Sequence, residues 1–241
     1  MKRIVAVSAL LALAACGGDN GGNITAPANS VAAVAAPQGQ DWTQVVSRTP
    51  EGGYVMGNPN ASLKLVEYGS RTCPTCGAFG QTGMQPLENT YVKSGKVSYE
   101  FHDFMVHAPD LGVAILGHCA GTAPFFPILE QMYLEQPQFL EKLESAGSFQ
   151  QSIQGRTPQA QAVAWVEHLG YIDFLKQRGV PETQARACLA DPKLMKAVTD
   201  LSQTAIDKGV TGTPTFFLNG QKLENQVQWS QIEQSLKAAG A

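Results

Sequence analysis

Two cysteines separated by two residues, Cys73 and Cys76, stand between a short apolar segment and a segment with helical features. Residues 63–68 predict a strand, because apolar side chains dominate there and turn-forming residues bound them. Pro74 suits the first turn of the following helix, where its missing N–H is not needed. A further strand at residues 97–101 gives the order strand, helix, strand, which implies parallel pairing with a right-handed crossover. The chain is therefore expected to form an α/β fold with both cysteines at the amino end of a helix.

This position suits thiol–disulfide exchange, which requires a thiolate that an ordinary cysteine supplies poorly at neutral pH. A helix N-terminus offers unpaired N–H groups and a positive dipole potential, and both stabilise a thiolate. Cys73, at the cap, is expected to be the exposed attacking thiol. Cys76 returns to the same helix face three residues later and is expected to be the buried resolving thiol. Thr75 lies where a side chain can tune the stability of the thiolate.

A zinc site and a purely structural bridge are the alternative interpretations of this cysteine pair. Zinc needs four ligands, usually in two close pairs, whereas Cys119 and Cys188 are isolated in the sequence. The histidines, none of which shows the matching spacing, are His102, His107, His118 and His168. A bridge across so short a loop would add little stability. Redox chemistry without a metal is therefore favoured.

The first sixteen residues have the features of a bacterial export signal. Two positive charges precede an apolar stretch over residues 4–15, which is too short to be a permanent membrane span. The stretch ends in Leu-Ala-Ala-Cys, which resembles a lipobox and predicts lipidation of Cys16. An ordinary signal peptide cut near Ala15 is the alternative. Gly17 follows the cysteine where Asp would favour inner-membrane retention, so by resemblance the outer membrane is the expected address.

Residues 17–40 consist of small and polar residues with almost no large apolar side chains. Such a composition cannot offset the entropy of ordering, so a flexible tether is expected, with the folded part starting near Asp41. The remaining chain is apolar enough to form a core, with 44% hydrophobic residues overall. The net charge of -3 and the absence of a basic patch exclude nucleic acid as an expected partner.

The five cysteines of the chain can be assigned without remainder. Lipidation of Cys16 leaves four, of which Cys73 and Cys76 form one pair. Cys119 and Cys188 then form a second candidate pair, and a compartment outside the cytoplasm allows disulfides to persist. Two buried free thiols remain the alternative for this second pair.

The second half of the chain changes from a helical pattern back to a strand pattern. Residues 109–208 predict several helices, most of them opened by a proline. A strand over 215–218 follows, then a two-residue Asn-Gly turn, a return strand and a closing helix over 229–239. The expected organisation is a sheet built from residues 41–108 and 209–241, interrupted by a packed helical insertion.

Three stretches together resemble the DsbA-type family of thioredoxin-fold proteins: residues 56–61, residues 66–76 with the Cys-Pro-Thr-Cys motif, and residues 210–217 with Gly-Thr-Pro-Thr-Phe. The resemblance extends over residues 55–239. It implies a thioredoxin fold with an inserted all-helical subdomain and a thiol:disulfide oxidoreductase that needs no cofactor.

The resemblance also implies roles for particular residues. Thr213 and Pro214 are expected to form a cis peptide bond that faces the sulfurs, with an ordinary trans turn as the alternative. Glu67 matches the family's buried acid and would exchange a proton with Cys76, unless it lies at a solvated strand end. Family insertions sometimes carry a second disulfide, which Cys119 and Cys188 would supply.

One departure from the family concerns the dipeptide between the two cysteines. The best-studied oxidases of the family have Pro-His there, and this chain has Pro74 and Thr75. The expected function remains an oxidase that donates the Cys73–Cys76 disulfide to exported proteins with free cysteines. A membrane redox partner would reoxidise it, and the protein is expected to be a monomer facing the periplasm in the cell envelope. A reductase or isomerase, and a lipid-anchored peptide-binding or chaperone module, are the alternatives.

Overall fold

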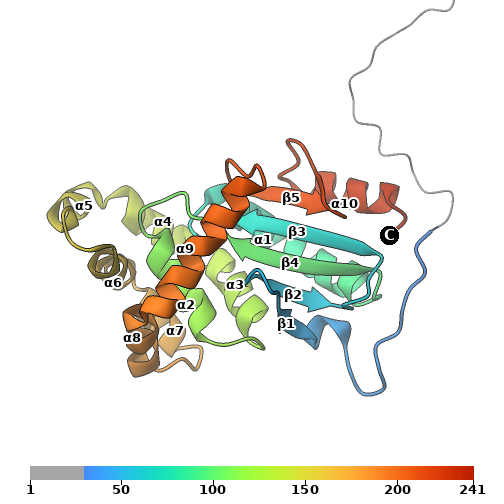
Figure 1. Cartoon of the computed structure of the whole chain (residues 1–241), viewed down its shortest axis with the longest axis horizontal. Helices are drawn as coiled ribbons and strands as arrows, with labels where there is room; N and C mark the ends of the chain where they lie inside the picture. Colours follow the sequence, from blue (N-terminus) through green and yellow to red (C-terminus); the bar gives the residue numbers. More distant parts are fainter. Residues whose placement is uncertain (1–29) are drawn as a thin grey trace, which may run out of the picture.

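The computed structural model describes residues 30–241, and a six-stranded mixed sheet forms its centre (Figure 1). The strand order is β1-β2-β4-β3-β5-β6. The strands are β1 (Val46–Arg48), β2 (Tyr54–Gly57), β3 (Leu63–Gly69), β4 (Val97–Asp103), β5 (Thr215–Leu218) and β6 (Gln221–Lys222). The predicted signal segment and the lipidation site at Cys16 lie outside the described residues.

The predicted strand–helix–strand unit is confirmed. β3 and β4 pair in parallel from Leu63 opposite Val97 to Gly69 opposite Asp103. They are connected through α1 (Pro74–Pro86), the π-helical segment η2 (Leu87–Val92) and a short turn. Both partners of this pair end at the same edge of the sheet, and α1 begins beside that edge.

Two strands, β1 and β2, precede the strand predicted at residues 63–68. β1 is short and exposed, and it shows no run of apolar residues that would identify a strand. β2 pairs antiparallel with β4, so its identity as a strand depends on a neighbour more than forty residues away in the sequence, such as Phe101 opposite Tyr54. β1 and β2 were not predicted, because tertiary pairing, rather than local pattern, makes these residues strands.

Helices cover both faces of the sheet. α1 and α10 (Trp229–Ala238) pack on one face, where Phe79, Ile232 and Leu236 join the apolar side chains of β3 and β4. α9 (Pro192–Asp207) crosses the opposite face, and its Ala205 lies in a small cluster with Tyr68 (Figure 1). α9 therefore links the inserted helices back to the sheet.

The helical insertion lies between β4 and β5 and has a core of its own. That core includes Trp165, Leu169 and Phe174. The helices are α2 (Asp110–Cys119), α3 (Phe125–Leu134), α4 (Gln136–Glu144), α5 (Gly147–Ile153), α6 (Pro158–Leu169), α7 (Tyr171–Lys176), α8 (Glu182–Ala190) and α9. The architecture is a thioredoxin fold with an inserted helical subdomain, as expected.

α1 and the insertion approach each other very closely at two glycines. The side chain of Gln136 fills the space beside Gly77, and Tyr133 fills the space beside Gly80. A methyl group at Gly80 would lie 2.7 Å from Cβ of Tyr133. Two glycines that weaken α1 as an isolated helix are therefore required for its packing.

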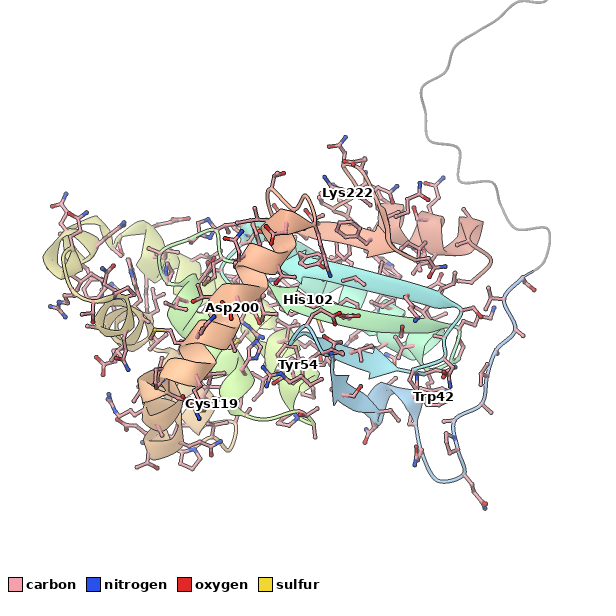
Figure 2. All side chains as sticks on the ribbon, viewed as in Figure 1. Trp42, Tyr54, His102, Cys119, Asp200 and Lys222 are labelled. Carbon is pink, nitrogen blue, oxygen red and sulfur yellow. A yellow bond between two sulfur atoms is a disulfide. The ribbon has the colours of Figure 1, made fainter. Side chains whose placement is uncertain are left out.

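Part of the segment expected to form a tether packs on the folded domain. Val31 donates its N–H to the carbonyl of Gly240, and Val34 donates to the carbonyl of Ser94. The indole of Trp42, labelled in Figure 2, donates to the carbonyl of Val34 at 2.7 Å. The prediction of a flexible tether is therefore wrong for residues 31–36, because two valines and backbone hydrogen bonds secure them despite the polar composition.

A disulfide joins Cys119 in α2 to Cys188 in α8 (Figure 2). The two cysteines are 69 residues apart in the sequence, and the bond lies inside the insertion, next to its core. Among residues 30–241, no helix combines the length and the apolar character that crossing a bilayer requires.

We predict that Gly80→Ala destabilises the protein by roughly 1–3 kcal/mol, because the new methyl group overpacks the contact with Tyr133. Thermal unfolding measures the effect. Gly147→Ala is the matched control, since nothing lies within 4 Å of the new methyl group, and it should leave the melting temperature unchanged or slightly raised. Equal behaviour of both variants would contradict the close approach.

We predict that replacing Cys119 and Cys188 by serine lowers the free energy of unfolding by about 4 kcal/mol, the chain-entropy value for a loop of this length. The thiol–disulfide exchange that the sequence predicts for Cys73 should be similar in this variant, because the bridge lies in the insertion. Calorimetry and a dithiol-oxidation assay measure the two effects. Free alkylation of both thiols in the folded, unreduced protein would contradict the bridge.

Candidate active site

Cys73 caps the N-terminus of α1 and Cys76 lies one turn further on. Cys73 has an extended backbone conformation, with φ -78° and ψ 122°, and Pro74 is the first helical residue. The carbonyl of Cys73 accepts the first helical hydrogen bond, from the N–H of Gly77 at 3.0 Å. The sulfur of Cys76 is fully buried, as expected. Cys73 is more enclosed than expected, at 7% exposure, because the loop before β5 covers it.

That covering loop contains the peptide bond between Thr213 and Pro214, which is cis. The sulfur of Cys73 lies 3.4 Å from the carbonyl oxygen of Thr213 and donates to it as a thiol. The trans turn considered for these residues is therefore wrong. The sequence-distant loop and the cysteine motif form a single site.

The two thiols have opposite electrostatic environments. A hydrogen bond from Cys76 is the main cause that lowers the pKa of Cys73 to about 5. The side chain of Thr213 and the N–H groups of Cys76 and Thr75 also lower it, against the effect of burial. Burial raises the pKa of Cys76, and the hydrogen bond to Cys73 and the charge of Glu67 add to the rise. At neutral pH the reduced site therefore holds one thiolate, on Cys73, and one thiol, on Cys76.

Glu67 lies on β3 and is fully buried, so a solvated strand end is excluded. Tyr99 donates its hydroxyl to Oε2 of Glu67 at 2.6 Å. Within residues 30–241, Oε1 of Glu67 has no hydrogen-bond partner. Burial raises the pKa of Glu67 to about 8, although the hydrogen bond from Tyr99 lowers it. A carboxyl group with this pKa can both accept and donate a proton near neutral pH.

A buried ion pair supports the loop that leads into the motif. The guanidinium of Arg71 donates to both carboxylate oxygens of Asp103, at 2.7 and 3.1 Å. His118 donates from Nε2 to the same carboxylate at 2.9 Å. Burial would raise the pKa of Asp103, but the charge of Arg71 and the hydrogen bonds from His118 and Arg71 hold it below its usual range. This cluster was not predicted from the sequence, because no local signal marks an arginine as buried.

Two side chains of the insertion secure the same loop. Asp110, at the start of α2, accepts hydrogen bonds from the hydroxyls of Ser70 and Thr72 and from two backbone N–H groups. Gln136, in α4, donates to the carbonyl oxygens of Arg71 and Cys73 at 3.0 and 2.9 Å. The backbone around Cys73 is therefore positioned from the sheet and from the insertion.

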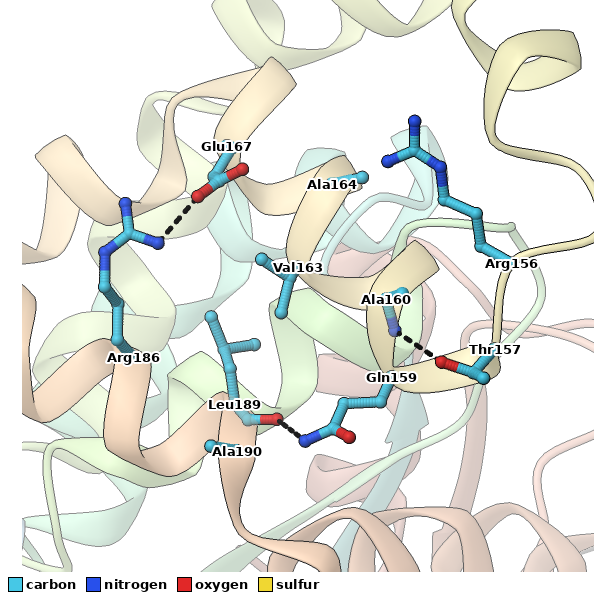
Figure 3. A pocket seen from close by; sticks show the side chains of 10 residues that line it. All are labelled: Arg156, Thr157, Gln159, Ala160, Val163, Ala164, Glu167, Arg186, Leu189 and Ala190. Atoms are coloured by element: carbon cyan, nitrogen blue, oxygen red, sulfur yellow. Dashed lines mark hydrogen bonds and ion pairs between the residues drawn. The ribbon is translucent and has the colours of Figure 1, made fainter.

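A groove of about 640 Å³ opens beside the motif. Its walls are largely apolar and come from α1 and from the loop before α10, and they include Pro74, Phe79 and Trp229. A second cavity, of about 450 Å³, lies between α6 and α8, where Arg186 forms an ion pair with Glu167 (Figure 3). No cysteine lines this second cavity, so it is not part of the thiol site.

A family model described as thioredoxin matches residues 49–238. The chain belongs to the thioredoxin family. A crystal structure of a protein-disulfide isomerase from Novosphingobium aromaticivorans superposes on this thioredoxin-family chain with a TM-score of 0.73 and 28% identity, covering 77% of this chain and 96% of the other. The alpha-DsbA1 structure from Wolbachia pipientis superposes with a TM-score of 0.57 at 19% identity, covering 76% of this chain and 88% of the other. These similarities show a DsbA-like fold.

A relative from Rickettsia prowazekii, provisionally named a protein-disulfide oxidoreductase, is 26% identical over 184 residues. The match covers 76% of this chain but only 60% of the relative. The thioredoxin-family chain therefore spans about three fifths of the length of that relative.

We predict that Cys73 in the reduced protein is alkylated by iodoacetamide with a pH midpoint of about 5. Folding lowers the pKa of the Cys73 thiol, so the thiolate stabilises the folded, reduced protein. This stabilisation is complete when the pH is above the ordinary thiol pKa, and it is lost as the pH falls through about 5. Cys76→Ala removes the main hydrogen-bond donor and should move the midpoint toward the ordinary value. An ordinary midpoint in the unaltered protein would contradict the described site.

Proposed function

We propose that this thioredoxin-family protein is an exported thiol:disulfide oxidoreductase, acting as an oxidase that donates the Cys73–Cys76 disulfide to proteins with free cysteines. The observation that carries the proposal is the position of the Cys73 sulfur between the N-terminus of α1 and the cis bond at Pro214. A helix N-terminus stabilises the thiolate, and a cis-proline loop leaves the Thr213 backbone beside the sulfur for an extended substrate.

In this proposal the reaction passes through a mixed disulfide. A substrate thiolate attacks the sulfur of Cys73, the bond between Cys73 and Cys76 breaks, and Cys76 departs as a thiolate that takes a proton from Glu67. A second substrate thiolate then attacks the substrate sulfur of the mixed disulfide and releases the thiolate of Cys73. The substrate loses two electrons and gains a disulfide, while the enzyme becomes the dithiol. A membrane redox partner would restore the enzyme disulfide.

The direction of exchange follows from the stability of the reduced form. A low pKa at Cys73 stabilises the dithiol state, and a stabilised dithiol state makes the disulfide a stronger oxidant. This supports the oxidase. Isomerase activity is the second candidate, because the Novosphingobium neighbour carries that name. Thr75 supplies no histidine to the motif, so the oxidising strength is expected to be below that of family members with Pro-His.

The groove beside the motif supports a peptide as substrate. Its apolar walls at Phe79 and Trp229 begin directly beside Pro74 and Thr75, so a chain bound there would present its cysteine to the sulfur of Cys73. An apolar groove of this volume fits the apolar side chains of an unfolded segment of a substrate protein. In a folded substrate protein those side chains are buried. A module that binds peptides without exchanging disulfides would use the same groove and would not need the two thiols.

The proposed location is the bacterial cell envelope. The basic and apolar leader and the lipobox-like sequence at Cys16 support export followed by attachment of the protein to a membrane through lipid. Gly17 supports the outer membrane as the address. We also propose that the protein is a monomer that faces the periplasm, and that residues 17–40 connect the anchor to the domain.

Serine variants of the two cysteines test this function. We predict that Cys73→Ser abolishes oxidation of a reduced peptide, because no sulfur remains for the first attack. Cys76→Ser should instead accumulate a mixed disulfide through Cys73, detectable by mass spectrometry.

The reduction potential measured against glutathione separates the candidate directions. A potential more oxidising than that of thioredoxin supports the oxidase, and a value near it supports a reductase. Full oxidising activity of Cys73→Ser would overturn the proposed chemistry. Client protection that persists when both cysteines are serine would support the binding module instead.

A further inference from the structure

Tyr133, a residue of α3 in the helical insertion, lies on the face of α1 that carries Cys76. Cys76 and Gly80 are four residues apart, so they occupy one helix face. The space that a side chain at Gly80 would need is taken by the ring and Cβ of Tyr133. In addition, Gln81 donates to the backbone carbonyl of Tyr133 at 2.9 Å, which fixes this residue against α1.

The hydroxyl of Tyr133 is buried without a protein partner. Tyr133 belongs to the same core cluster as Cys76 and Tyr99, although its helix is part of the insertion. Among the hydrogen bonds of residues 30–241 none involves this hydroxyl, and none involves Oε1 of Glu67. Buried polar atoms are rarely left unpaired, since each costs about 1–3 kcal/mol, so an unpaired hydroxyl on a residue packed against the thiol-bearing helix calls for an explanation.

The pKa of Tyr133 depends on the charges of the reacting groups. Burial raises the pKa of Tyr133, and negative charge on Cys76 and on Glu67 raises it further. Tyr99 already donates its hydroxyl to the other carboxylate oxygen of Glu67. The ring of Tyr133 lies against Gly80, one turn along α1 from Cys76, so Tyr133 is a neutral hydroxyl donor on the helix face that carries this thiol.

We propose that Tyr133 is a positioning residue for the thiol chemistry, donating its hydroxyl to the negative charge that passes between Cys76 and Glu67. The inference rests on the proposed exchange function and holds for either direction of exchange. When the Cys73–Cys76 bond breaks, the electron pair remains on the sulfur of Cys76 until a proton arrives from Glu67. In the reverse step Glu67 accepts that proton, the Cys76 sulfur bonds to Cys73, and the substrate sulfur departs as a thiolate.

Each of these states places one negative charge in a fully buried region, where an unpaired charge is costly. A hydroxyl donor stabilises the charge without adding a charge of its own. The titratable and charged groups around the site come from β3, β4, α1, η2 and the loop before α1. They are Glu67, Tyr99, Asp103, Cys73, Cys76, Glu88 and Arg71.

Tyr133→Phe tests the inference, because it removes the hydroxyl and keeps the ring against Gly80. The protein is prepared with glutathione bound to Cys73 as a mixed disulfide, and glutathione release by Cys76 is followed as a function of pH. We expect the apparent pKa of release to rise by about one unit and the rate at neutral pH to fall about tenfold, the effect of one lost hydrogen bond to a charge. The midpoint for alkylation of Cys73 in the reduced protein should change far less.

Tyr171→Phe is the matched control. Its hydroxyl is also buried without a partner among the described residues, but its ring packs on Phe139 in the core of the insertion. This variant should release glutathione with the pH profile of the unaltered protein. Thermal unfolding of both variants separates packing from chemistry, because a merely structural role of Tyr133 would lower the melting temperature and leave the apparent pKa unchanged.

Coinciding pH profiles for Tyr133→Phe and the unaltered protein would overturn the inference. That result would leave the proposed function intact, provided that the unaltered protein releases glutathione and Cys76→Ser does not. Failure of the unaltered protein to release glutathione would count against the proposed function itself. The two failures are therefore distinguishable in one experiment.

Discussion

The ion pair between Arg71 and Asp103 connects the parts of the structure that the site requires. Arg71 belongs to the loop before Cys73, Asp103 ends β4, and His118 of α2 donates to the same carboxylate. Both charged residues are almost completely buried. Removing either partner would leave an uncompensated buried charge, which costs several kcal/mol. The pair therefore fixes the motif loop to the sheet and to the insertion at once.

The thiol site works because its negative charges are kept apart. The environment of Cys73 favours a thiolate, through hydrogen bonds from Cys76 and from backbone N–H groups. The environments of Cys76 and Glu67 favour their protonated forms, mainly through burial. One thiolate, one thiol and one titrating carboxyl group thus share a small volume. In the proposed exchange the charge moves from one sulfur to the other, and a proton must follow it.

The sequence predicted the parts of this arrangement that depend on local pattern. The helix start at Cys73, the parallel pairing of β3 with β4 and the turn at Asn219 follow from residue types at fixed offsets. Resemblance to a family added the cis bond at Pro214 and the buried position of Glu67. These features are specified within a few residues, or by a distant motif of a recognisable type.

Long-range packing supplied what the sequence could not predict. β1 and β2 become strands through pairing that begins at β4, and residues 31–36 pack on the domain through hydrogen bonds to Gly240 and Ser94. Gly77 and Gly80 leave the spaces on α1 that Gln136 and Tyr133 occupy. No periodicity within α1 can report what a helix fifty residues away will place there.

The helical insertion therefore contributes directly to the structure of the thiol site. Asp110 accepts hydrogen bonds from the hydroxyls of Ser70 and Thr72, and Gln136 donates to the backbone carbonyls on either side of Thr72. Tyr133 packs on the face of α1 that carries Cys76. A thioredoxin sheet without these helices would leave that face of α1 open to water, and water would stabilise charge on Cys76 and Glu67 without discriminating between them. The insertion excludes water from this region. The hydrogen-bond donors of the protein then determine whether the charge lies on Cys76 or on Glu67.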